Sequence, residues 1–241
     1  LTDAMEVDGE TYPEGAFFFE GEGLRGLLAE GASETGVVVR AVAARPEVSG
    51  MQLRAPRIGL WDRYGGSMPS GWTRFVFDQF EFDYEVVYPP ELDAGDLNER
   101  FDVLVFPDGA IPAGEGGGGF RGGGMPDGML ERLPAELRDR VGSVSLDTPV
   151  PAILDFIENG GTVVAIGGSS RLGIHAGLPI ADYMVDERGE PYSSEEYYTP
   201  GSVHDVAVEH GSPVTHGLGD RVKIMHSHSP VFRVEEGAES V

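Results

Sequence analysis

The stretch TVVAIGGSSRLGIH, residues 162–175, decides the fold that we expect of this chain. Apolar and β-branched residues run into a Gly-Gly-Ser-Ser turn at 167–170, called the elbow turn below, and a helix-like segment follows. Strand, sharp turn and helix in this order are typical of a nucleophile elbow, whose tip stands above the carboxyl end of a central strand. The tip is Ser169, but Arg171 replaces the glycine that usually follows two places later. We therefore interpret the segment as an elbow that has lost its chemistry.

Alternating strands and helices precede the elbow turn. Three apolar stretches predict strands, at residues 57–62, 83–89 and 101–107. A helical pattern follows each of them, at 71–80 with Ser70 as the expected cap, at 92–100 and at 148–159. This alternation favours a parallel sheet with helices on both sides. Later short strands, at 203–209, 222–225 and 231–235, are expected as antiparallel additions at one sheet edge.

Two further segments differ from this pattern. Residues 1–56 predict a small α+β extension, with a helix ending at Gly31 and a strand at 37–42. Residues 113–147 predict a surface insertion, because eight of the eleven residues at 114–124 are glycine. A phosphate-binding P-loop needs a Gly-Lys-Ser or Gly-Lys-Thr ending, which this run lacks, so nucleotide binding is not expected there.

Composition narrows the classes of function. Forty-one acidic and 17 basic residues give a net charge of -24, which repels nucleic acid and anionic lipid. Acidic residues are abundant and Lys223 is the only lysine, which suits either a high-salt environment or a GC-rich genome that favours Arg, Gly, Ala and Asp codons. The absence of cysteine excludes disulfides, thiolate zinc sites and thiol catalysis. No apolar run approaches the roughly 20 residues of a membrane span, so we expect a soluble protein, and a start at Leu1 suggests a piece of a longer one.

Five segments together resemble one known family. They are Arg57–Pro89, Phe101–Pro112, Ile153–Ser170, Tyr197–Val203 and His228–Val234, with Gly66–Arg74 as the most specific part. They are similar to the class I glutamine amidotransferase-like domain, in the version that follows the catalytic domain of large bacterial zinc carboxypeptidases of the carboxypeptidase A type. The resemblance covers residues 57–241. It implies a flavodoxin-like three-layer sandwich with a mainly parallel sheet, in an extracellular or periplasmic protein. Residues 1–56 are then the region that connects it to an upstream peptidase domain.

The resemblance also implies which positions bear the family's active site. The elbow motif maps onto Gly168, Ser169 and Ser170, so Ser169 stands where the family has its cysteine nucleophile. The oxyanion-hole glycine maps onto Gly109. The family's late His-x-Glu pair is replaced by His226 and His228 without a glutamate, so glutamine hydrolysis is not expected. No histidine has a glutamate three places later, so zinc is expected only in the upstream domain.

Several interpretations of these residues stay open. Ser169 is either a nucleophile activated by His226 or His228, with Asp108 or Glu196 behind it, or merely a helix cap. His226 and His228 share a strand face and either hold a metal, with His204 or His216 as a third ligand, or are ordinary strand residues, which we favour.

The loop after the first strand of the alternating region carries a second set of candidates. Asp62, Arg63, Ser67 and Trp72 follow that strand at the sheet edge where ligands bind in open α/β folds. Trp72, beside Arg74, either faces a peptide or sugar or packs into the core, and we favour the core. Tyr192, Tyr197 and Tyr198 either close over this edge or pack their own loop.

These observations give a ranked set of functions. The first is a non-catalytic, degenerate amidotransferase-like domain of a zinc carboxypeptidase, without a cofactor of its own, serving stability, substrate presentation or partner contact. The second is a serine-dependent hydrolase that uses Ser169. The third is a module that binds a peptide or small anion at the elbow, through Gly109, Gly168, Ser170 and Trp72.

Overall fold

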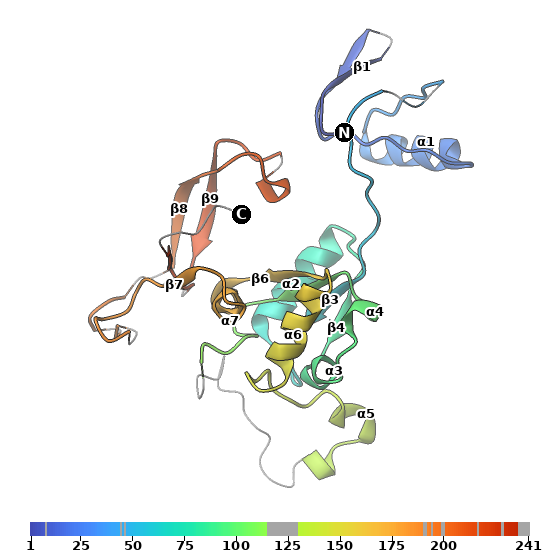
Figure 1. Ribbon diagram of the computed structural model, residues 1–241. Helices are drawn as coiled ribbons and strands as arrows, with labels where there is room; N and C mark the ends of the chain where they lie inside the picture. Colours follow the sequence, from blue (N-terminus) through green and yellow to red (C-terminus); the bar gives the residue numbers. More distant parts are fainter. Residues whose placement is uncertain are drawn as a thin grey trace. The chain divides into compact units, whose positions relative to one another are not determined.

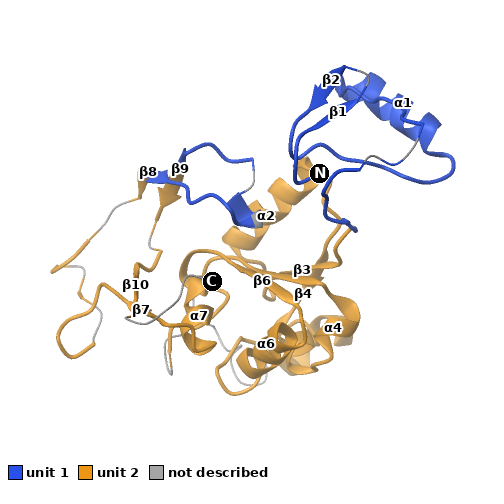
Figure 2. Ribbon diagram, turned by 45° about the horizontal axis from the view of Figure 1, so that its top comes forward, with its two compact units in different colours: residues 1–54, 205–223 blue, residues 55–204, 224–241 orange. Residues whose placement is uncertain are grey.

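The computed structural model divides the chain into two compact units (Figure 2). Unit 1 consists of Leu1–Arg54 and Asp205–Lys223, and unit 2 consists of Ala55–His204 and Ile224–Val241. The structure describes residues 1–7, 9–43, 45, 47–114, 130–189, 192–193, 195–198, 201–215, 217–227 and 229–235.

A four-stranded parallel sheet forms the centre of unit 2 (Figure 1). Its strand order is β4-β3-β5-β6, formed by β3 (Ile58–Trp61), β4 (Glu85–Val87), β5 (Val103–Phe106) and β6 (Thr162–Ala165). All three pairings are parallel, and they set Gly59 beside Leu104 and Leu104 beside Val163. The expected α/β, flavodoxin-like fold is confirmed, because helical crossovers join parallel strands of this order.

Helices cover both faces of this sheet. Leu104 and Phe106 belong to the larger core cluster, which takes side chains from α3 (Pro89–Asp93), α4 (Leu97–Arg100), α6 (Pro149–Glu158) and α7 (Leu172–His175). Ile58, Leu60 and Val105 point to the other face and pack against Phe77 of α2 (Met68–Gln79). Strand residues alternate between the faces, so the two clusters are the two sides of one pleated sheet.

Helix starts differ from the sequence prediction in one instructive place. We expected Ser70 to cap a helix at 71–80, but α2 begins at Met68 and Ser67 is its cap, accepting the Ser70 amide at 3.2 Å. Pro69 explains the shift, since proline suits the first helical turn. The helix predicted at 92–100 is two short helices, α3 and α4, separated by Gly95 and Asp96, both with positive φ.

The later strands form sheets of their own. Antiparallel additions to the core sheet were expected, and this prediction is wrong. β7 (Ile180–Asp182) pairs only with β10 (Phe232–Val234), and β8 (Ser202–Ala207) pairs with β9 (Arg221–His226). Turns η1 (Leu130–Arg132) and α5 (Ala135–Arg138) lie in the predicted insertion, whose residues 115–129 are outside the described residues.

Unit 1 contains the predicted small α+β extension. The hairpin of β1 (Met5–Val7) and β2 (Glu10–Tyr12) precedes α1 (Leu24–Thr35), and η3 (Pro213–Thr215) follows later in the chain. The strand expected at 37–42 is absent, and Val38 is 72% exposed there. None of the helices in the described ranges is both long and apolar enough to cross a membrane.

Candidate functional site

Three loops meet the carboxyl edge of the parallel sheet and form the candidate site. The Asp62 loop (residues 62–67) follows β3, the Pro107 loop (107–111) follows β5, and the elbow turn with η2 (Gly167–Arg171) follows β6. In the order β4-β3-β5-β6 the winding direction changes between β3 and β5. Ligands of open α/β sheets bind in the crevice at such a switch point.

Ser169 is buried in the elbow turn, and among the residues that the structure describes its hydroxyl bonds only to the backbone of the Pro107 loop. The hydroxyl donates to the Pro107 carbonyl at 2.6 Å and accepts the amides of Ala110 at 3.0 Å and Ile111 at 3.1 Å. A serine hydroxyl has one hydrogen to donate and two lone pairs. These three bonds therefore use its whole hydrogen-bonding capacity.

The Pro107 loop has the conformation that aims these amides. Pro107, Asp108, Gly109 and Ala110 form a turn in which the Ala110 amide is shared with the Pro107 carbonyl at 3.2 Å. Gly109 has φ 78°, as the third residue of a type II turn requires. The resemblance places an oxyanion-hole glycine in this loop. The amides that follow Gly109 are aimed at the Ser169 oxygen itself, which leaves no position between them for a substrate carbonyl.

The amide side of the elbow turn is also occupied by the chain. The Gly168 amide donates to the Asp108 carboxylate at 2.6 Å, and the Ser170 hydroxyl donates to the Gly167 carbonyl at 2.6 Å. Gly167 has φ 61°, and a Cβ there would lie 2.5 Å from Asp108 Oδ1. An internal carboxylate thus lies where the anion-site hypothesis places a ligand.

The predicted bases and acids make other contacts. His226 Nε2 lies 3.1 Å from the Ser229 carbonyl, and the His226 ring packs edge-on to His204 with centroids 5.5 Å apart. Glu196 accepts the Ser193 hydroxyl at 2.7 Å, and this bond together with the Ser193 amide lowers the Glu196 pKa. His228 and His216 lie outside the described residues.

The described part of the chain contains no cluster of side chains that could hold a metal ion. Within it, no three His, Asp or Glu side chains gather closely enough to hold an ion. His204, one of the two possible third ligands in the metal-binding interpretation, bonds through Nε2 to the Ser202 hydroxyl at 2.9 Å.

The Asp62 loop is closed by a second polar network. Asp62 is 3% exposed, and its Oδ1 accepts the amides of Arg63 at 2.8 Å and Ser67 at 2.9 Å. Its Oδ2 pairs with the Arg74 guanidinium of α2. The Ser67 hydroxyl donates to Ser70 Oγ at 2.7 Å, and Ser70 donates to the Trp61 carbonyl at 2.8 Å. The network ties the end of β3 to the start of α2.

The aromatic candidates lie on the surface. We expected Trp72 in the core, but it is 64% exposed, with Phe75 edge-on at 6.0 Å, so that interpretation is wrong. Tyr192, Tyr197 and Tyr198 are all exposed as well. The Asp62–Arg74 pair and the contacts of the Ala110 and Ile111 amides were not predicted from the sequence, although Pro-Asp-Gly at 107–109 indicates a turn.

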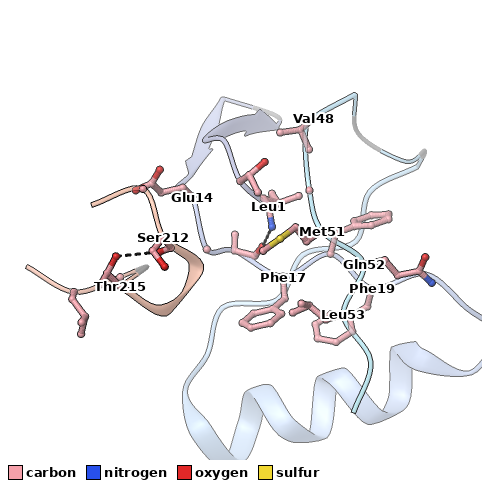
Figure 3. A pocket seen from close by; sticks show the side chains of 18 of the residues that line it. Leu1, Glu14, Phe17, Phe19, Val48, Met51, Gln52, Leu53, Ser212 and Thr215 are labelled. Carbon is pink, nitrogen blue, oxygen red and sulfur yellow. Dashed lines mark hydrogen bonds between the residues drawn. The ribbon is translucent and has the colours of Figure 1, made fainter. Parts of the chain in front are cut away.

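A separate hollow of about 1230 Å³ lies in unit 1 (Figure 3). Phe17, Phe19, Met51 and Leu53 line it, and Figure 3 shows them together on one side, with Ser212 and Thr215 on another. These four apolar side chains are each more than half exposed. Ligand pockets instead enclose most of the ligand and hold a few converging polar groups. The carboxyl edge of unit 2 therefore remains the better candidate site.

Comparisons with models of protein families, with curated proteins and with solved structures return no match for this chain. The class of protein that the structure itself defines is an α/β, flavodoxin-like domain with a small α+β extension.

Proposed function

We propose that this chain is a non-catalytic, amidotransferase-like accessory module of an exported zinc carboxypeptidase. The fold and the residues of the resemblance support the kind of module. One observation carries the lack of catalysis, namely that the Ser169 hydroxyl uses its hydrogen and both lone pairs on the Pro107 loop.

Nucleophilic attack from this position requires the serine to be released first. A base has to remove the hydroxyl proton, which Ser169 shares with the Pro107 carbonyl. An attacking oxygen also needs a free lone pair, whereas both are directed at the Ala110 and Ile111 amides. Freeing it disrupts three buried hydrogen bonds, each worth about 1 kcal/mol. While these bonds are intact, the same two amides are not available as donors for an oxyanion.

Binding of an anion at the elbow is disfavoured by charge. The Asp108 carboxylate already accepts the Gly168 amide at 2.6 Å. A second anion near it experiences like-charge repulsion, in a chain whose net charge is already -24. Structural and partner-binding roles therefore fit this edge better than capture of an anion.

A fluorophosphonate probe with mapping of the labelled peptide tests the lack of catalysis. We expect no label on Ser169 in folded protein, and no ammonia release from L-glutamine. Ser169→Ala gives the background, and an active serine hydrolase treated in parallel shows that the probe works. Label on Ser169 that disappears in Ser169→Ala means that the serine is a nucleophile, and the proposal is then wrong.

The peptidase context has its own test. The reading frame before Leu1 should encode a peptidase domain with a His-x-x-Glu zinc motif and a distant third histidine. If so, removing residues 57–241 from the full protein should leave zinc-dependent peptide hydrolysis present and lower its thermal stability. A preceding frame without that motif refutes the accessory role, whatever the result at Ser169.

A further inference from the structure

The helix α2 turns its apolar side away from the sheet. Its buried residue is Ser70, whereas Trp72 is 64% and Phe80 72% exposed. Residues 72, 75, 76 and 80 fall on adjoining rows of a helix with 3.6 residues per turn, so they share one side. An amphipathic helix normally buries this side. In α2 the buried side consists of Ser70 and Phe77, flanked by Thr73 and Arg74.

The sheet face under α2 is incompletely covered at the β6 edge. On the opposite face, α3, α4, α6 and α7 contribute to the core. On this face the residues packed on Ile58, Leu60 and Val105 come from α2 and from positions 84 and 103. Val164 and Ile166 of the edge strand and its continuation are 44% and 45% exposed. Parallel sheets are normally covered on both faces, but no helix in the described residues contributes to the core beside α2 on this face.

One hydrogen bond fixes which flank of α2 faces this strip. The Tyr84 hydroxyl donates to Asp78 at 3.1 Å, so Asp78 lies on the flank toward β4. Val76 and Phe80 lie roughly 200° and 160° around the helix from Asp78, at about 100° per residue. They therefore face the β5 and β6 side. We call the combined surface the α2–β6 face, formed by Trp72, Val76, Phe80, Val164 and Ile166.

This face has the size of an interaction surface. At their exposed fractions, these five side chains present on the order of 500 Å² of apolar surface, taking roughly 150–250 Å² for each aromatic. The largest apolar patch of a typical monomer is about 300–600 Å² and is often functional. A standard interface takes roughly 800 Å² from each partner. A single docked helix is large enough to cover an apolar surface of this size.

Charge identifies the kind of partner. Beyond the carboxyl end of α2, Glu81 and Asp83 are exposed acids, whereas the one basic residue of the helix, Arg74, is held by Asp62. The whole chain carries -24. A second copy of this chain, or an anionic membrane, is repelled by such a surface, but a cation is attracted to it. We propose that the α2–β6 face binds a positively charged amphipathic helix of a partner protein, apolar on the side that packs and rich in Lys and Arg on the other. This inference does not depend on the role of Ser169.

A designed peptide tests the proposal on the full chain. The probe is a labelled Leu/Lys helix of about 18 residues, or five turns, and a scrambled peptide of the same composition controls for charge alone. We expect the amphipathic peptide to bind at least about tenfold tighter than the scrambled one, with an affinity that falls as salt rises. The variant Trp72→Ser/Phe80→Ser should weaken binding about tenfold or more.

The chain offers a matched control for that variant. Phe17 and Phe19 are also exposed, by 69% and 55%, but lie in unit 1. Phe17→Ser/Phe19→Ser should leave the affinity within about twofold, and circular dichroism should show both variants folded. Equal affinity for the two peptides, or equal effects of the two variants, overturns the proposal. Binding of neutral lipid vesicles instead of the peptide, or self-association lost in Trp72→Ser/Phe80→Ser, assigns the face to a membrane or to a second copy and also overturns it.

Discussion

The Asp62 loop and the elbow turn lie at the same edge of the sheet, and each holds a polar side chain by hydrogen bonds within the chain. The side chain is charged in the Asp62 loop and neutral in the elbow turn. The Asp62 loop uses a buried carboxylate that accepts two amides and pairs with Arg74. The elbow turn uses a neutral hydroxyl whose three bonds all go to the backbone. Both loops place a polar residue where an active site is expected, and both direct it inward. Polar residues at such an edge therefore have a structural role when the chain itself fills their hydrogen-bonding capacity.

Substitution of the central polar residue should lower the stability more in the Asp62 loop than in the elbow turn. Asp62→Ala removes the acceptor of two amides and leaves Arg74 without its partner, so we expect a loss of about 3 kcal/mol in unfolding free energy. Part of the cost is relieved because the Arg74 side chain is 33% exposed. Urea unfolding followed by circular dichroism measures it.

Asp182→Ala is the matched control, since the Arg171–Asp182 pair is 25% and 29% exposed. Solvated pairs of that kind contribute about 1 kcal/mol or less. Equal losses for Asp62→Ala and Asp182→Ala would contradict the role given to burial.

Substitution of Ser169 in the elbow turn should give the next largest loss of stability. Ser169→Ala leaves the Ile111 amide and the Pro107 carbonyl without this partner, and we expect a loss of about 2 kcal/mol in unfolding free energy. Ser170→Ala loses one bond to the Gly167 carbonyl and should cost under about 1 kcal/mol. A larger loss for Ser170→Ala than for Ser169→Ala would reverse the assignment of the structural serine.

Gly167 gives a smaller effect that isolates the Asp108 contact. Gly167→Ala meets both positive φ and Asp108 Oδ1, whereas Gly177→Ala meets only positive φ, because nothing lies within 4 Å of its Cβ position. We expect Gly177→Ala to lower the free energy of unfolding by about 1 kcal/mol, and Gly167→Ala to lower it by roughly 1–2 kcal/mol more, as measured by thermal unfolding. Adding Asp108→Gly should remove that excess. An excess that persists in the double variant refutes the contact as its cause.

The smallest effect concerns the far end of α2. Burial first, and then the hydrogen bond to Asp78, raise the pKa of Tyr84 above its ordinary value. Folding therefore favours the protonated phenol, and this stabilisation is complete below the ordinary tyrosine pKa of about 10. It is lost as pH rises through the pKa of the folded state.

The difference in tyrosinate absorbance between the wild type and Tyr84→Phe follows this titration. Asp78→Ala should move the midpoint of Tyr84 down toward the ordinary value. An unchanged midpoint would mean that Asp78 has no part in the shift.

Much of the fold was predictable because its signals are local. Apolar runs at 58–61 and 103–106 and the helix from Pro149 carry their periodicity in a few residues, and the structure confirms them. The strand expected at 37–42 fails for a physical reason. β-branched residues favour a strand only where a neighbour pairs with it, and in the described residues this segment lies exposed outside any sheet.

The state of the candidate site was less predictable. The sequence located Ser169 at the carboxyl edge, but the bonds that fill its hydroxyl reach residues 58 to 62 positions away. No local pattern reveals them. Likewise, the helical periodicity of Trp72 and Phe75 indicates an amphipathic α2 without indicating which side is covered, and here the more apolar side is exposed.

Amide hydrogen exchange at Ile111 tests the central claim most directly. Its amide donates to the Ser169 hydroxyl, whereas the Ala110 amide is shared with the Pro107 carbonyl. We predict slow exchange at Ile111 in the wild type and at least about tenfold faster exchange in Ser169→Ala, with the amides of β5 unchanged. Equally fast exchange at Ile111 in both proteins would show that the hydroxyl is free, and the account of a filled, inactive serine would be wrong.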